Sequence, residues 1–125
     1  MKGIFVNENE APFANWIVDG WKTIETRSRN MLKPLVGEWV AIIRTKSGEK
    51  PVVIGTVKIT DSFREDVRFF REDTMIHVGS KYDTGMRWMY VLEDPAPISP
   101  DGWYPLPENA VRHGLSWAEW WTKRD

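Results

Sequence analysis

The chain has 125 residues, which suits one domain with its own core and leaves little room for a second. Hydrophobic residues make up 42% and charged residues 28%, near the globular average, so the composition argues against a disordered chain. The absence of cysteine excludes disulfides and thiolate metal sites, and a net charge of −1 argues against tight binding of long duplex nucleic acid.

Apolar alternation, proline and glycine mark the elements in the first half of the chain. Alternating or β-branched runs predict strands, whereas proline in a first turn and glycine after a last turn delimit a helix. One apolar stripe of Phe13, Trp16 and Ile17 predicts the buried face of that helix. The predicted elements are a strand over Lys2–Asn7, a helix over Pro12–Asp19 ended by Gly20, a strand over Thr23–Thr26, a loop over Ser28–Gly37, and strands over Glu38–Thr45 and Val52–Thr60 joined by a turn at Ser47–Pro51.

The second half of the chain is less regular. Phe63, Val67 and Phe70 fall on one helical face, which predicts a short helix within the charged stretch Ser62–Asp73. The other predicted elements are a short strand over Met75–Val78, a strand over Met86–Glu93, a proline-rich covering loop over Asp94–Glu108, and a last short helix, capped by Ser116, that contains Trp117, Trp120 and Trp121. These elements predict a single α+β domain over residues 1–125, a small β-barrel of about five to six mixed strands with two or three short helices.

The segment Gly20–Arg27 is the most informative for function. Glu25 and Arg27 share a face of the predicted strand, and Lys22 joins them if it lies on the bend after Gly20. An amine, a carboxylate and a guanidinium would then converge on a site for a phosphate, a carboxamide or a base edge, or prime one another for proton transfer. The same charges also fit a row of weak ion pairs on an exposed strand.

This segment resembles the signature of the ASCH domain family, G-x-K-x-x-E-x-R, at Gly20, Lys22, Glu25 and Arg27. The likeness covers about the first half of the chain and includes Pro12–Ala14, Ile17, Gly37–Ile42 and Ile54–Val57. It implies a PUA-like barrel with a cleft beside the first helix, and a function in binding RNA or nucleotides. Some family members resemble amidohydrolases that deacetylate cytidine derivatives, and ribonuclease activity has been attributed to others. In those amidohydrolases a threonine stands at the position of Glu25.

Three functions are compatible with these sequence features. The first is a binding domain for single-stranded RNA or a small nucleotide or modified nucleoside, and its expected ligand-binding residues are Lys22, Glu25, Arg27, Trp21, Phe13, Asn9 and Arg29. The second is a small hydrolase, an amidohydrolase on acylated nucleosides or a ribonuclease, in which Glu25 is the general base and Lys22 polarises the reacting group. The third is a non-catalytic protein-interaction module.

The three functions predict different geometries for the charged cluster. A closed pocket with a strongly perturbed Lys22 and Glu25 favours an enzyme, an open groove with basic edges favours RNA binding, and a flat exposed cluster favours an interaction module. Because Lys22 and Glu25 lie in a polar segment rather than on an apolar stripe, we expect Lys22→Ala to change stability by no more than about 1 kcal/mol.

Other sequence features bear on metal, cofactor and membrane binding. His77 and His113 are far apart and have no acidic residue at metal-ligand spacing, so no metal site is expected. No phosphate-binding glycine loop or dinucleotide fingerprint is present, and no cofactor is expected. The loop Ser80–Asp83 is a candidate lid or ligand-binding loop. No apolar run reaches the length of a membrane span and no signal peptide is recognised, so we expect a cytoplasmic protein without a membrane partner.

We expect the protein to bind long duplex DNA or RNA only weakly at physiological salt. A net charge of −1 releases too few counterions to drive a tight nonspecific complex. The measurement is the dissociation constant of a labelled duplex as a function of salt concentration, with a short single strand as the comparison. Tight duplex binding that weakens steeply with salt would contradict this prediction.

Overall fold

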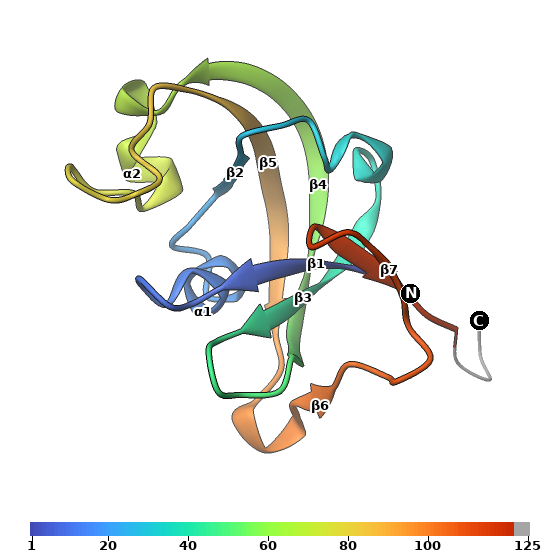
Figure 1. The fold of residues 1–125 in the computed structure, drawn as a ribbon. Coiled ribbons are helices and arrows are strands. Elements are labelled where there is room, and N and C mark those ends of the chain that lie inside the picture. The colour runs from blue at the N-terminus through green and yellow to red at the C-terminus, as the bar shows by residue number, and fades with distance from the viewer. Residues whose placement is uncertain (122–125) are drawn as a thin grey trace.

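Strands carry most of the regular structure in the computed structural model, which describes residues 1–121 (Figure 1). The helices and strands are β1 (Lys2–Asn7), α1 (Phe13–Val18), β2 (Ile24–Arg27), β3 (Trp39–Thr45), β4 (Val52–Asp66), α2 (Arg71–Thr74), β5 (Met86–Pro97), β6 (Tyr104–Pro105), β7 (Val111–His113) and β8 (Trp117–Glu119). Three short 3-10 helices lie at Lys33–Leu35, Val67–Phe69 and Pro100–Gly102.

One mixed sheet of eight strands organises the chain. Its order is β2-β5-β4-β3-β1-β8-β7, and β6 pairs with β4 at the side. β1 runs parallel to β3, and the other paired strands are antiparallel. Within residues 1–121 the ladder is an open path, and no backbone pairing joins β2 to β7. The α+β class is therefore confirmed, whereas a closed barrel is not.

The long antiparallel pair of β4 and β5 gives the sheet its curvature (Figure 1). Register shifts between Thr56 and Lys58 and between Ile59 and Asp61 interrupt this ladder, and such bulges bend and twist a strand pair. The bend brings β2, at one end of the sheet, within reach of β1. The Arg27 side chain of β2 donates to the main-chain carbonyl of Phe5 in β1 at 2.6 Å.

The short helix α1 covers the largest core cluster. Phe13 and Ile17 are 5% and 1% exposed and Trp16 packs beside them, so the predicted apolar stripe is confirmed. The helix lies very close to β4 at Gly55. A Cβ on Gly55 would lie 2.6 Å from Cγ1 of Val18 and from the carbonyl oxygen of Ala96, so only glycine fits there.

Sequence patterns predicted the first half of the fold well and the region after residue 60 poorly. The helix expected within Ser62–Asp73 is wrong, because residues 62–66 continue β4 and pair with β5. Only the 3-10 helix Val67–Phe69 and the single turn α2 follow. The strand expected over Met75–Val78 is also absent, since Met75 ends α2 in a left-handed conformation with φ 58°. Local periodicity did not reveal that a distant partner strand was available.

The C-terminal prediction was wrong for the same reason. Trp117–Glu119 forms β8, not a helix, and pairs with both β1 and β7. Trp120 is 1% exposed beside this strand, whereas Trp121 faces solvent. The covering loop expected over Asp94–Glu108 contains the end of β5 and all of β6, which raises the strand count from the expected five or six to eight.

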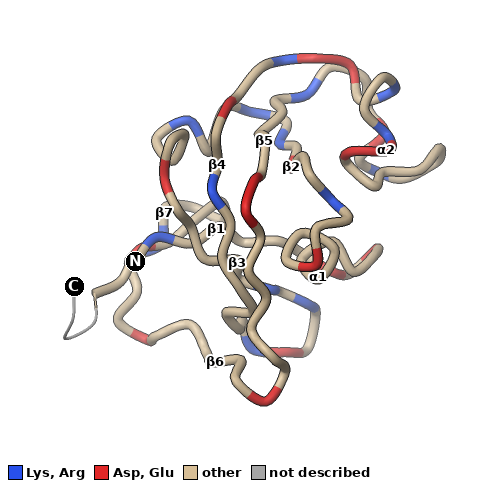
Figure 2. Tube along the Cα trace, turned by 180° about the vertical axis from the view of Figure 1, so that it is seen from behind, with Lys and Arg blue, Asp and Glu red and all other residues tan. Residues whose placement is uncertain are grey.

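Charged residues do not gather on one element. Figure 2 shows Lys and Arg interspersed with Asp and Glu along the trace. No helix among residues 1–121 is long and apolar enough to cross a membrane.

We expect Gly55→Ala to destabilise the fold by roughly 1–3 kcal/mol, because its methyl group would push α1 away from β4. The measurement is the free energy of unfolding from urea titration. Ser47→Ala in the exposed turn between β3 and β4 is the control and should leave stability almost unchanged. Equal stability of the two variants would show that α1 tolerates displacement.

Candidate functional site

A tight bend between α1 and β2 positions the first candidate residue. Gly20 has φ +87°, a left-handed conformation that glycine adopts without strain, and it follows the last turn of α1. The backbone N–H groups of Trp21 and Lys22 both donate to the carbonyl of Trp16, at 2.9 and 3.0 Å. The chain thus turns back across the helix end, and the Lys22 side chain is buried rather than exposed.

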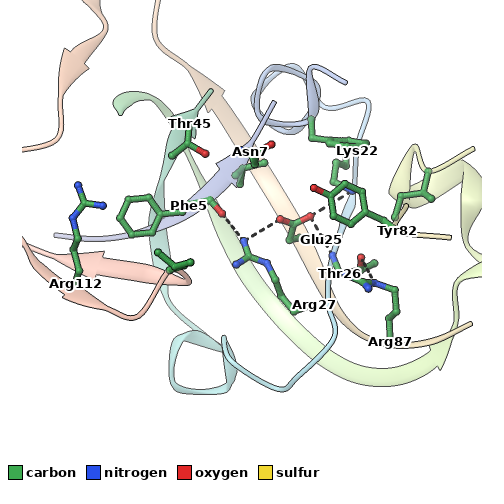
Figure 3. Close-up of a pocket in the computed structure, with 14 residues that line it drawn as sticks. Phe5, Asn7, Lys22, Glu25, Thr26, Arg27, Thr45, Tyr82, Arg87 and Arg112 are labelled. Atoms are coloured by element: carbon green, nitrogen blue, oxygen red, sulfur yellow. Dashed lines mark hydrogen bonds and ion pairs between the residues drawn. The ribbon is translucent and has the colours of Figure 1, made fainter. Parts of the chain in front are cut away.

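Lys22, Glu25 and Arg27 form one connected cluster (Figure 3). Nζ of Lys22 lies 3.5 Å from Oε1 of Glu25, and Nη2 of Arg27 lies 3.1 Å from Oε2. Lys22 is 2% exposed and Glu25 8%, so this is not an exposed row of ion pairs. The Lys22 ammonium also donates to the carbonyl of Thr74 and lies 5.0 Å from the centre of the Phe13 ring.

The Glu25 carboxylate holds the two cations in place. It accepts hydrogen bonds from Arg27 and from the backbone N–H of Thr26, besides its contact with Lys22. Burial raises the pKa of Glu25, but the charges of Lys22 and Arg27 outweigh burial and leave the pKa below its usual value. Glu25 is therefore an ionised carboxylate at neutral pH.

Lys22 shows the opposite balance. Burial lowers the pKa of Lys22 more than the Glu25 carboxylate raises it, and the positive charges of Arg27 and Arg87 lower it further. A buried amine with a lowered pKa beside an ionised carboxylate is suited to proton transfer or to holding an oxygen of a ligand.

A cavity of about 440 Å³ opens over this cluster, and its lining mixes aromatic rings with cationic side chains. Its volume lies within the usual range for small-molecule sites, about 300–1,000 Å³. The lining residues come from β1, α1, the bend after α1, β2, β3, the segment 76–87 and the β7–β8 hairpin; they are Phe5, Val6, Asn7, Phe13, Lys22, Glu25, Thr26, Arg27, Thr45, Ile76, Tyr82, Arg87, Arg112 and Leu115. Figure 3 shows Lys22, Glu25 and Arg27 between Tyr82 and Arg87 on one side and Phe5 and Arg112 on the other.

The structure brings together four of the seven expected ligand-binding residues. Phe13, Lys22, Glu25 and Arg27 all line the cavity. The three others are exposed and lie outside its lining: Trp21 (69% exposed), Asn9 and Arg29. Asn9 instead uses its side-chain oxygen to accept the backbone N–H of Ser47 at 2.8 Å, in the β3–β4 turn.

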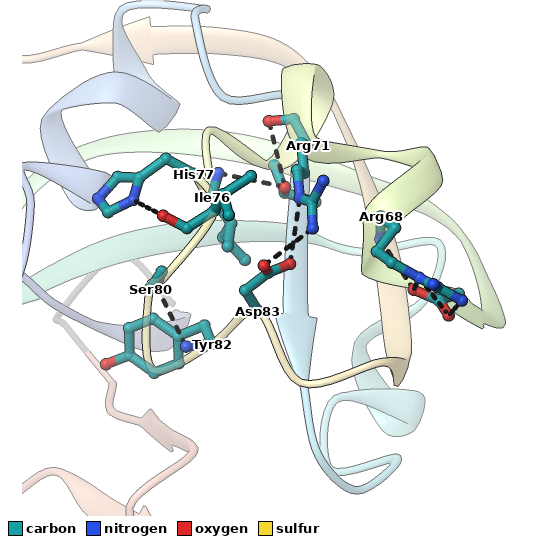
Figure 4. Close-up of polar contacts among 10 residues, drawn as sticks. Arg68, Arg71, Ile76, His77, Ser80, Tyr82 and Asp83 are labelled. Carbon is teal, nitrogen blue, oxygen red and sulfur yellow. Dashed lines mark hydrogen bonds and ion pairs between the residues drawn. The ribbon is translucent and has the colours of Figure 1, made fainter.

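Sequence reasoning missed several lining residues. Thr26 was expected on the opposite strand face from Glu25, yet it also lines the cavity. Arg87 stands on β5 and no local motif marks it. Tyr82 lies in the loop identified as a candidate lid, and this loop is held by specific contacts (Figure 4). Ser80 accepts from the backbone N–H of Tyr82 at 3.1 Å, and Asp83 accepts from Arg71 at 2.9 Å.

We expected Lys22→Ala to cost little stability because Lys22 lies in a polar segment of the sequence. The structure contradicts this reason, because the side chain is buried. Lys22 is among the largest fully buried side chains, since the bend after Gly20 turns it inward. Truncation to alanine would leave a void and would deprive the Thr74 carbonyl and Glu25 of a donor. Lys22→Met removes the same donor but has a similar volume and fills the void, so it is the better test of function.

No group of three or more metal-ligating side chains occurs among residues 1–121. His77 and His113 lie on different segments and each makes its own contact, with the Val78 carbonyl and with Glu119.

Comparison with known proteins identifies the fold. No protein-family model matches the chain, and no curated protein matches it in sequence. Among solved structures, the ASCH protein of Zymomonas mobilis matches 98% of this chain and 89% of its own, with a TM-score of 0.63 and 21% identity. Two mutant forms of that protein have TM-scores of 0.65 and 0.59 at 20% identity; the first alignment covers 97% of this chain and 89% of the mutant, the second 86% and 92%. The chain therefore has the fold of an ASCH domain.

We expect the stability that Glu25 contributes to disappear in acid. A lowered folded-state pKa means that the unfolded state takes up the proton first as pH falls. The contribution is fully present above the ordinary value of 4.5 and is lost as pH falls through the lower folded-state pKa. At neutral pH, Glu25→Gln should cost about 3 kcal/mol, because two buried cations lose their anion.

The measurement is urea unfolding of the wild type and Glu25→Gln as pH falls from neutral through and below 4.5, over which the difference between the two stabilities should narrow. Glu72→Gln, which removes an exposed carboxylate from α2, is the control. A constant gap between wild type and Glu25→Gln across this range would refute the proposed coupling.

Proposed function

We propose that the cavity binds one nucleotide or modified nucleoside, free or at the end of a single-stranded RNA. The observation that carries this proposal is the cavity of about 440 Å³ in which a fixed cluster of Lys22, Glu25 and Arg27 lies beside the rings of Phe13 and Tyr82. Aromatic rings pack against base faces, and fixed polar groups read base edges.

The contacts assign a role to each member of the cluster. Glu25 already accepts from several groups, so its main role is to hold Lys22 and Arg27 in position. Those two cations donate to carbonyl or anionic oxygens of the ligand. Phe13 and Tyr82 meet edge to face, with ring centres 5.8 Å apart, and form an apolar wall for the base.

The volume of the cavity favours a single nucleotide unit, rather than a duplex, as the ligand. A cavity of this volume accommodates one such unit, and the protein as a whole lacks a basic excess. Trp21 and Arg29 are exposed outside the cavity and would contact only a ligand longer than one nucleotide.

A second candidate function, hydrolysis of the same class of ligand, is favoured by the burial of the Lys22–Glu25 pair. An enclosed, perturbed pair is the geometry expected of an enzyme. The directions of the pKa shifts reverse the roles expected from the sequence. A carboxylate with a lowered pKa is a weaker base, whereas an amine with a lowered pKa is more readily neutral, so Lys22 is the better proton acceptor from water. Arg27 would then stabilise the developing oxyanion.

We expect a nucleoside or nucleotide to raise the melting temperature of the wild type, because a ligand that binds the native state stabilises it. Lys22→Met should weaken binding by about 2–5 kcal/mol, the usual cost of removing one partner of a desolvated charged contact. The measurements are a thermal-shift screen with nucleosides, nucleotides and short single-stranded RNAs, followed by dissociation constants for the best ligand.

Lys33→Met, an exposed lysine of the first 3-10 helix, is the matched control and should bind as the wild type does. Product analysis with the best ligand separates the two functions: a hydrolase releases product in the wild type and loses turnover in Lys22→Met, whereas a binding domain leaves the ligand intact. Wild-type affinity in folded Lys22→Met, or no stabilising ligand in the whole panel, would overturn the proposal.

A further inference from the structure

Arg87 lines the cavity but does not belong to the ion-pair cluster of Lys22, Glu25 and Arg27. It lies on β5, is 9% exposed, and borders the cavity next to Thr26, on the Tyr82 side (Figure 3). It lies far along the chain from the Gly20–Arg27 motif.

The contacts of the Arg87 guanidinium are all with neutral groups. Nε donates to the hydroxyl of Thr26 at 2.9 Å and Nη1 donates to the hydroxyl of Thr84 at 3.1 Å. The guanidinium carbon lies 5.8 Å from the centre of the Tyr82 ring. Within residues 1–121 no carboxylate forms an ion pair with Arg87, and its remaining N–H groups have no hydrogen-bond partner.

Four other arginines of residues 1–121 have carboxylate partners, whereas Arg29, Arg64 and Arg112 form no ion pair but are exposed to solvent. Ion pairs join Arg27 to Glu25, Arg44 to Glu8, Arg68 to Asp66 and Arg71 to Asp83. Arg87 is thus a largely buried cation held by two hydroxyls; no carboxylate of residues 1–121 forms an ion pair with it, and Glu25 acts on it only as a nearby charge. Burial lowers the pKa of Arg87, which reflects the cost of keeping this charge away from water, yet a guanidinium remains protonated at neutral pH.

The lining of the cavity as a whole also has more cationic than anionic side chains. Its cationic side chains are Lys22, Arg27, Arg87 and Arg112, and its one carboxylate is Glu25. That carboxylate is already shared between Lys22 and Arg27. The lining therefore carries more cationic than anionic side chains in a protein whose net charge is −1, and although Arg112 is exposed to solvent this excess favours an anionic ligand.

We propose that Arg87 anchors a phosphate group, and that the cavity takes a phosphorylated nucleoside rather than a neutral one. The two threonine hydroxyls fix the plane of the guanidinium and leave its other N–H groups for phosphate oxygens, the pairing for which arginine geometry is best suited. The nucleoside part of this inference rests on the proposed function, whereas the phosphate part rests on Arg87 alone.

The test compares ribonucleosides with their 5′-monophosphates by calorimetric titration, with inorganic phosphate as a further probe. The wild type should bind the monophosphate roughly 10- to 100-fold more tightly than the nucleoside, the gain expected from a charge-assisted contact. Arg87→Gln should lose this ratio while it keeps the nucleoside affinity. A purely structural role would change both affinities together. A 5′-phosphorylated dinucleotide and its unphosphorylated form, titrated in parallel, separate a free nucleotide from a strand end.

Arg68→Gln is the matched control, because Arg68 is exposed, pairs with Asp66 and lies outside the lining. Equal wild-type affinity for nucleoside and monophosphate would overturn the phosphate subsite and leave the proposed function standing. A ratio that persists in folded Arg87→Gln would also overturn it. If Arg87→Gln does not fold, Arg87→Lys replaces it, with a reduced ratio expected because lysine lacks the bidentate fork.

The two proposals fail separately. If no nucleoside or nucleotide binds, yet inorganic phosphate raises the melting temperature of the wild type and not of the Arg87 variant, the proposed function fails and the subsite stands. If phosphate has no effect and no monophosphate binds, the subsite fails as well.

Discussion

The arrangement of the site depends on one buried carboxylate, that of Glu25. It ties Lys22 to Arg27, and each cation reaches onward to a main-chain carbonyl, Lys22 to Thr74 at the end of α2 and Arg27 to Phe5 in β1. Desolvating three charged groups is costly, and this cost is offset only when every partner is in place. The cluster thus links α2, β2 and β1 through side chains.

This linkage occurs where the sheet has no backbone ladder. β2 ends the hydrogen-bonded path on one side, and Arg27 spans the gap from β2 to β1 at 2.6 Å from the Phe5 carbonyl. A side-chain bridge leaves room that a paired strand would fill, and the cavity occupies that room. The polar site therefore lies where the sheet is open, between β2 and β1.

Distant segments complete the walls of the cavity. Tyr82 is positioned by its loop, where Ser80 donates to the Glu10 carboxylate at 2.6 Å and lowers the pKa of Glu10. Arg87 comes from β5, and Arg112 comes from the β7–β8 hairpin, where it lies over the Phe5 ring. These walls add positive charge that forms no ion pair with Glu25, and the proposed phosphate subsite depends on that charge although the chain as a whole carries a net charge of −1.

The sequence by itself determined the elements whose signals are local, β1, α1 and β3, and the shared face of Glu25 and Arg27, because strand residues two apart share a face. It left open whether Lys22 joins them or the three charges form an exposed row of ion pairs. Only the tertiary structure decided the length of β4, the strand at Trp117–Glu119 and the presence of Arg87 in the site, since each depends on a partner strand distant in sequence. It also decided the burial of Lys22, because a charged residue in a polar segment gives no local sign that the folded chain will enclose it.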